Sequence, residues 1–87
     1  MIVKKEFVLK EVAGESIVVS TDSESVDFSG MLVLNSAGTF LFHALQKECS
    51  MDELVSEMLE KYNIDEKTAR KDCLEFTEKL SKNHVLA

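Results

Sequence analysis

The chain lacks proline and tryptophan and is poor in several other residue types. Its 87 residues include three glycines, two cysteines and one tyrosine. Without stretches rich in proline or glycine, no segment has the composition of a linker or a low-complexity tract. A chain of this length is typical of one small domain, which buries roughly 60 to 65% of its unfolded surface. We therefore expect a single domain over residues 1–87.

The two cysteines and two histidines do not form a recognisable site. Cys49 and Cys73 have no Cys-x-x-Cys spacing, and neither stands at a zinc-ligand spacing from His43 or His84. We expect buried free thiols in a reducing compartment, with no metal and no cofactor. The chain also lacks a Gly-x-Ser-x-Gly elbow and a phosphate-binding glycine loop, so the sequence predicts no enzymatic activity.

Long apolar runs and an excess of positive charge are absent as well. No segment approaches the roughly 20 apolar residues that cross a bilayer, and the start of the chain lacks the order of a signal peptide. The 16 acidic residues outnumber the 10 basic ones and give a net charge of −6. This charge opposes non-specific attachment to nucleic acid and to anionic membranes. We expect a cytoplasmic protein that binds neither.

Three short segments have the pattern of β-strands. Residues 7–12 and 16–20 are rich in β-branched side chains and are separated by Ala13-Gly-Glu15, which indicates a hairpin. After a polar loop over residues 21–29, Met31-Leu-Val-Leu34 predicts a third strand that is apolar on both faces. The domain core can cover one face of such a strand, and a segment of another molecule would cover the other. The pattern therefore indicates a binding module, without deciding which two side chains face the core.

The rest of the chain predicts three helices. Asn35 or Ser36 can cap the first, Ser50-Met-Asp-Glu53 has the order of a capping box for the second, and Asp65 can cap the third. In the third helix Ala69, Cys73, Phe76 and Leu80 recur at helical spacing, which predicts a buried stripe ending near Asn83. We expect the tail, residues 85–87, to fold back onto the core. Three strands followed by three helices predict an α+β domain of winged helix-turn-helix-like form.

The order of several residues in this pattern resembles a known family. The marks are Gly14, Met31-Leu-Val-Leu-Asn35 followed by Gly38 and Phe42, Leu54-Val55, Tyr62-Asn-Ile-Asp-Glu66, Ala69 with Asp72, and Phe76 with Leu80. Together they resemble the PqqD-like family over about residues 7–86. Members of this family are also called precursor-peptide recognition elements, and they act in the biosynthesis of ribosomally made, post-translationally modified peptides.

The resemblance implies a peptide carrier rather than a catalyst. Such domains bind the leader part of a precursor peptide, which adds as a strand to the edge of the third strand and lies against the third helix. They present the peptide to a tailoring enzyme, often a radical-SAM protein, and the tethering raises the local concentration of the modifiable segment. The resemblance does not decide between a redox cofactor made from a peptide and another modified peptide as the product.

The same resemblance implies a set of peptide-binding residues. The third strand would supply the pairing edge, and the flank of the third helix would supply the groove wall, with Phe76 touching both core and ligand. The expected residues are Met31, Leu32, Val33, Leu34, Asp72, Glu75, Phe76 and Lys79. Burial between helices is the alternative explanation of the apolar strand, and the resemblance favours a ligand edge over it. For the helix stripe core packing is the favoured explanation, with Phe76 as the exception. Gly38 in a helical first turn indicates close approach of a neighbouring strand.

Two other functions remain open at this point. The third helix of a winged helix can read DNA, and this one carries Lys67, Arg70, Lys71, Lys79 and Lys82. Four acidic residues on the same helix and the acidity of the whole chain oppose that function. The apolar strand edge could also pair with its own copy, which would give a dimer.

Overall fold

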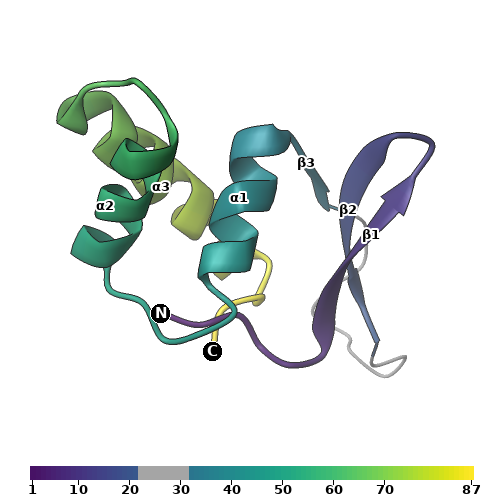
Figure 1. Ribbon diagram of the computed structural model, residues 1–87. Helices are drawn as coiled ribbons and strands as arrows, with labels where there is room; N and C mark the ends of the chain where they lie inside the picture. The colour runs from purple at the N-terminus through teal and green to yellow at the C-terminus, as the bar shows by residue number, and fades with distance from the viewer. Residues whose placement is uncertain (22–31) are drawn as a thin grey trace.

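The computed structural model describes residues 1–21 and 32–87 of the chain. Three antiparallel strands precede three helices, which confirms the α+β architecture expected from the sequence (Figure 1). The elements are β1 (Phe7–Val12), β2 (Glu15–Ser20), β3 (Leu32–Leu34), α1 (Ser36–Ala44), α2 (Met51–Lys61) and α3 (Glu66–Lys82). Most of the expected loop 21–29, and Met31 of the expected third strand, lie outside the described residues.

The hairpin of β1 and β2 forms where the sequence predicts it. Val12 pairs with Glu15 across a two-residue turn, in which Ala13 and Gly14 both have positive φ, 53° and 83°. Such a turn matches the twist of the flanking strands, and Gly14 adopts this backbone conformation without a Cβ penalty. In the sheet β2 lies between β1 and β3, so β3 is an edge strand.

The three helices begin at the caps that the sequence indicates. The Asn35 side chain accepts a hydrogen bond from the Gly38 N–H at 2.8 Å, so Asn35 rather than Ser36 caps α1. Ser50 and Glu53 exchange both hydrogen bonds of a capping box at the start of α2. Asp65 accepts from the Thr68 N–H at 2.7 Å, and α3 ends at the expected Asn83. Each cap satisfies N–H groups that a helix start leaves without a partner.

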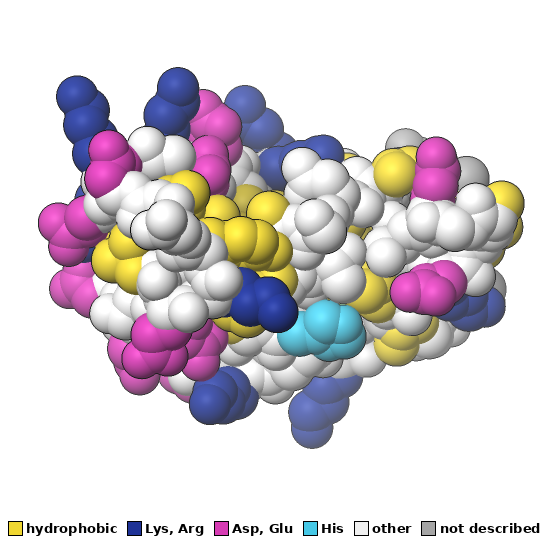
Figure 2. Space-filling model, turned by 45° about the horizontal axis from the view of Figure 1, so that its top comes forward, with side chains coloured by type: hydrophobic (Ala, Val, Ile, Leu, Met, Phe, Trp, Pro, Cys, Tyr) yellow, Lys and Arg dark blue, Asp and Glu magenta, His cyan; other side chains and the backbone are white. Residues whose placement is uncertain are grey.

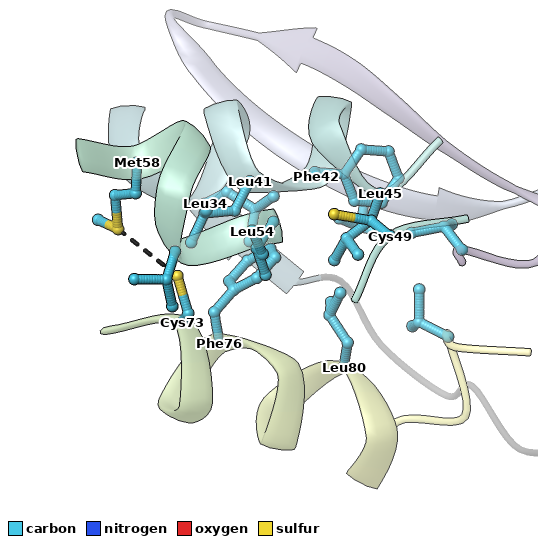
Figure 3. Packing of buried hydrophobic residues seen from close by; sticks show 14 of the residues in the cluster. Leu34, Leu41, Phe42, Leu45, Cys49, Leu54, Met58, Cys73, Phe76 and Leu80 are labelled. Atoms are coloured by element: carbon cyan, nitrogen blue, oxygen red, sulfur yellow. Dashed lines mark hydrogen bonds between the residues drawn. The ribbon is translucent and has the colours of Figure 1, made fainter. Parts of the chain in front are cut away.

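The core lies where the three helices meet the inner face of the sheet. Ala69, Cys73 and Leu80 are fully buried and Phe76 is 9% exposed, which confirms the stripe expected on α3. In Figure 3 the side chains of all three helices point toward one another, and Cys73 Sγ lies 3.7 Å from Met58 Sδ. On α1 the buried residues are Gly38, Leu41 and Phe42, and Leu45 at its C-terminal cap is also buried.

The two ends of the chain meet beneath the helices, as Figure 1 shows. Val3 forms an antiparallel bridge with Leu86, the Lys4 N–H donates to the Val85 carbonyl at 2.8 Å, and Val85 is fully buried. The expected return of the tail onto the core is therefore confirmed. No helix within residues 1–21 and 32–87 has the length and apolar character needed to traverse a membrane.

Candidate functional site

The outer edge of the short strand β3 is the first element of the candidate site. Within the described residues β3 pairs with β2 alone, in the register Ser16 with Leu34, Ile17 with Val33 and Val18 with Leu32. An edge strand presents N–H and C=O groups that can pair with another chain. The outer edge of β3 is thus able to accept an additional strand.

The register of the sheet decides which residue of β3 presents its backbone to that edge. A two-residue turn closes on a hydrogen-bonded pair, here Val12 with Glu15, and such pairs alternate along an antiparallel ladder. By this alternation Ile17 directs its N–H and C=O toward β1. Val33, which lies opposite Ile17, therefore directs its N–H and C=O away from β2. One residue of β3 offers a donor and an acceptor to a guest strand.

The side chains of β3 divide between the core and the surface. Leu34 is 6% exposed and faces the core, whereas Val33 is 49% exposed. Leu32 is half-buried and packs against the core cluster on the same side as Leu34. The sequence left open which pair of the four residues faces inward, and the structure assigns Leu32 and Leu34 to the inner face.

A groove of about 300 Å³ lies between the β3–α1 segment and α3. Leu41 of α1 and Met58 of α2, each 2% exposed, contribute to its apolar base together with Leu34 and Phe76. The full lining is Val33, Leu34, Asn35, Ala37, Gly38, Leu41, Met58, Asp72, Glu75, Phe76 and Lys79. The groove therefore runs beside the strand edge and has an apolar interior with charged side chains on the α3 side.

Gly38 allows the strand and the two helices to approach closely at this groove. A Cβ at position 38 would lie 3.3 Å from Phe76 Cε1 and 3.4 Å from Leu34 Cβ. The distance to Phe76 is shorter than the usual spacing of carbon atoms in contact, and the distance to Leu34 is at the short end of ordinary contact. This geometry agrees with the expectation that Gly38 serves packing. The close neighbours of position 38 include Phe76 of α3 as well as Leu34 of β3.

Three charged side chains of α3 line the groove. Asp72 is half-buried, while Glu75 and Lys79 are exposed. None of the three forms an ion pair or side-chain hydrogen bond within the described part of the chain; the ion pairs there join Met1 with Glu48, Arg70 with Asp52, and Lys82 with Glu78. The groove therefore carries charge that has no ion-pair partner among residues 1–21 and 32–87.

Most of the residues expected from the sequence come together at this groove. Val33, Leu34, Asp72, Glu75, Phe76 and Lys79 all line it. Leu32 does not, and Met31 lies outside the described residues. Sequence reasoning missed Asn35, Ala37, Leu41 and Met58 as lining residues, and read Gly38 only as packing. The glycine in the first turn of α1 was the one local signal; Leu41 and Met58 look like ordinary core residues in the sequence.

The thiols lie in the core rather than in the groove. Cys49 and Cys73 are buried and free, as expected. Burial raises the pKa of the Cys73 thiol to about 11, and the carboxylate of Asp72 adds to this shift. A thiol with so high a pKa is a poor nucleophile near neutral pH. Within residues 1–21 and 32–87, no three side chains of the metal-ligating types gather into a site.

Charged side chains of both signs lie on α3 and on the face of the described residues that Figure 2 shows. Arg70 of α3 pairs with Asp52 at 3.1 Å, and Lys82 pairs with Glu78 at 3.1 Å. In Figure 2 acidic and basic side chains are interspersed on the face shown. DNA contacts need an excess of cations on one face, so this arrangement does not favour the DNA-binding alternative.

Comparison with known proteins gives one family match and one similar structure. The family model described as coenzyme PQQ synthesis protein D (PqqD) matches residues 8–86. The fold is similar to the structure of TbiB1 in complex with the TbiA(beta) leader peptide, with a TM-score of 0.76 and 17% sequence identity. That alignment covers 99% of this chain and 94% of the other. No curated protein sequence matches this chain.

Proposed function

Because the chain belongs to the PqqD family, we propose that it binds the leader segment of a ribosomally made precursor peptide. The guest adds as a strand beside β3 and lies in the groove along α3. The observation that carries this proposal is the outward-facing backbone of Val33 beside a groove of about 300 Å³ that has apolar side chains at its base and charged ones on its α3 wall. The similarity in fold to TbiB1, whose structure is a complex with a leader peptide, supports the binding of such a peptide. Addition of an extended peptide to an exposed sheet edge is a recurring mode of peptide recognition.

The strand edge alone supplies only part of the affinity. Val33 can form two main-chain hydrogen bonds, and each contributes about 1 kcal/mol net. A micromolar complex requires about 8 kcal/mol. Most of the binding free energy must therefore come from side chains of the guest that enter the groove over Leu34, Leu41, Met58 and Phe76. A three-residue strand is therefore sufficient as a docking edge, because contacts in the groove supply the larger part of the binding free energy.

The domain then acts as an adaptor and performs no chemistry of its own. We take its partner to be a tailoring enzyme of the radical-SAM type, which modifies the core peptide while the leader stays bound. The groove supports this role, since its ionisable side chains are Asp72, Glu75 and Lys79, and no histidine, cysteine or serine lines it within the described residues. A tethered precursor reaches the enzyme at a high effective concentration.

The test uses synthetic peptides that cover the N-terminal part of each short open reading frame beside the gene. Titrated into the ¹⁵N-labelled domain, the cognate peptide should shift the amide signals of Val33 and Leu34 and those of α3. Val33→Pro removes the outward N–H and should weaken binding by about fivefold or more, the loss of about 1 kcal/mol for one hydrogen bond. Circular dichroism should stay unchanged, because proline is tolerated at an outer strand edge. Val33→Ala keeps the N–H and is the matched control.

Two results would contradict this mode of binding. A folded Val33→Pro variant that binds the peptide as tightly as the parent would show that the edge of β3 is not used. Sedimentation of the domain over a range of concentrations tests the alternative use of the same edge. A stable dimer that the leader peptide does not dissociate would show that β3 pairs with its own copy instead.

A further inference from the structure

Glu75 and Lys79 of the groove wall have no ion-pair partner within the described residues. Glu75 and Lys79 stand at the same i, i+4 spacing as Glu78 and Lys82 on the same helix. Glu78 and Lys82 form an ion pair at 3.1 Å, whereas Glu75 and Lys79 form none within the described residues. The spacing therefore permits pairing, and the two groove charges are left available to a ligand.

Asp72 adds to the acidic end of this arrangement. It is half-buried in the groove wall, and the nearby Arg70 is engaged with Asp52 at 3.1 Å. A partly buried carboxylate without a partner is unfavourable, and a cation from a ligand relieves that cost. The α3 wall thus has an acidic part, Asp72 and Glu75, and a basic part, Lys79, beside an apolar base.

The helix sets the distance between these two parts. Asp72 and Lys79 are seven positions apart, which corresponds to about 10 Å along a helix axis. An extended chain advances about 3.3 Å per residue, so this distance corresponds to about three residues of a guest strand. On a guest that runs along α3, charges that match both parts therefore stand two to four positions apart.

We propose, on the basis of the proposed function, that the guest leader carries a lysine or arginine and, two to four positions away, an aspartate or glutamate. The cation contacts Asp72 and Glu75, the carboxylate contacts Lys79, and an apolar side chain between them enters the base of the groove. Charge complementarity of this kind selects partners and fixes register, while the apolar contacts supply most of the affinity.

The experiment selects binders from a library of random linear peptides displayed on phage. Three forms of the domain are used: the parent, the charge-exchanged variant Glu75→Lys/Lys79→Glu, and the control variant Glu78→Lys/Lys82→Glu. Both double variants keep the net charge and alter exposed residues of α3 at the same spacing, but only the first alters the groove. Amide shifts of Val33 and Leu34 identify the selected peptides that occupy the site.

Peptides selected on the parent should be enriched in an oppositely charged pair two to four positions apart. Such a peptide should bind the Glu75→Lys/Lys79→Glu variant about fivefold more weakly, a ratio that corresponds to about 1 kcal/mol. The same peptide with its two charges exchanged should bind this variant better than the parent. The Glu78→Lys/Lys82→Glu control should bind all peptides like the parent.

The outcomes separate this inference from the function on which it rests. Peptides that shift the Val33 and Leu34 amides but show the charge distribution of the starting library would overturn the charge requirement alone. Equal affinity of the parent and the Glu75→Lys/Lys79→Glu variant for charge-exchanged peptides would do the same. Failure to select any peptide that shifts these amides would overturn the proposed function, and the charge requirement with it.

Discussion

Substitution of Gly38 by alanine should separate binding from stability, because Gly38 lies at the groove but has an ordinary helical backbone. The new Cβ would lie 3.3 Å from Phe76 Cε1 and 3.3 Å from the capping oxygen Asn35 Oδ1, so the ring and the Asn35 side chain must each move by a few tenths of an ångström. Phe76 borders the open groove and can move into it. Alanine also improves helix propensity by about 0.5 to 1 kcal/mol, which offsets the cost of this movement. We expect the free energy of unfolding to change by less than about 1 kcal/mol.

Binding of the leader should respond more clearly to the same change. The added methyl and the displaced ring occupy space that the guest would otherwise fill, equivalent to about one methylene group or about 0.8 kcal/mol. The dissociation constant should therefore rise about fourfold. Urea denaturation followed by circular dichroism measures the stability, and fluorescence anisotropy with a labelled leader peptide measures the affinity.

Gly14→Ala is the matched control for this substitution. Gly14 has φ +83°, and a Cβ there would meet no atom within 4 Å. The expected cost is backbone strain of about 1 to 2 kcal/mol, with no change in the groove near Phe76. Gly14→Ala should thus lower stability and leave binding unchanged, the reverse of Gly38→Ala. Unchanged affinity in Gly38→Ala would refute the assignment of Gly38 to the binding groove.

Three further predictions concern the core, a thiol and the helix caps. Phe76→Ala should lower the free energy of unfolding by about 3 kcal/mol and weaken leader binding. Leu74→Ala, at a half-exposed position of the same helix, should do neither. Equal effects in the two variants would contradict the role of Phe76. With its pKa raised to about 11 by burial, Cys73 should react with a thiol reagent at pH 8 only as fast as the domain unfolds, and rapid labelling of the native protein would be inconsistent with this burial. Hydrogen bonds from Ser50 lower the pKa of the Glu53 carboxyl below its ordinary 4.5, and hydrogen bonds from Thr68 lower that of Asp65 below its ordinary 3.8. The two ionised carboxylates therefore stabilise the fold fully above these ordinary pKa values, and the stabilisation is lost as the pH falls through the lowered pKa values. Asp65→Asn keeps an acceptor that does not titrate, and its acid unfolding curve should be correspondingly less steep.

Local patterns in the sequence determined most of the secondary structure. The capping box of Ser50 and Glu53, the cap at Asp65 and the glycine turn of the hairpin each depend on residues within a few positions of one another. The spacing of Ala69, Cys73, Phe76 and Leu80 likewise fixed the buried face of α3. Such features can be predicted from the sequence because helix caps, turns and helical periodicity are short-range properties.

Only the tertiary structure decided how these elements form a groove. Leu41 and Met58 are ordinary core residues by their local pattern, and they reach the groove because α1 and α2 pack against α3. The outward direction of the Val33 backbone follows from the register with β2, in which a shift of one residue would reverse every side chain of β3. Asp72, Glu75 and Lys79 were candidates from the sequence, but only the structure shows that none of them has an ion-pair partner within the described chain, since the i, i+4 spacing of Glu75 and Lys79 permits a pair. The sequence by itself therefore determined the helices and strands, whose causes are local, while the strand register and helix packing decided the site.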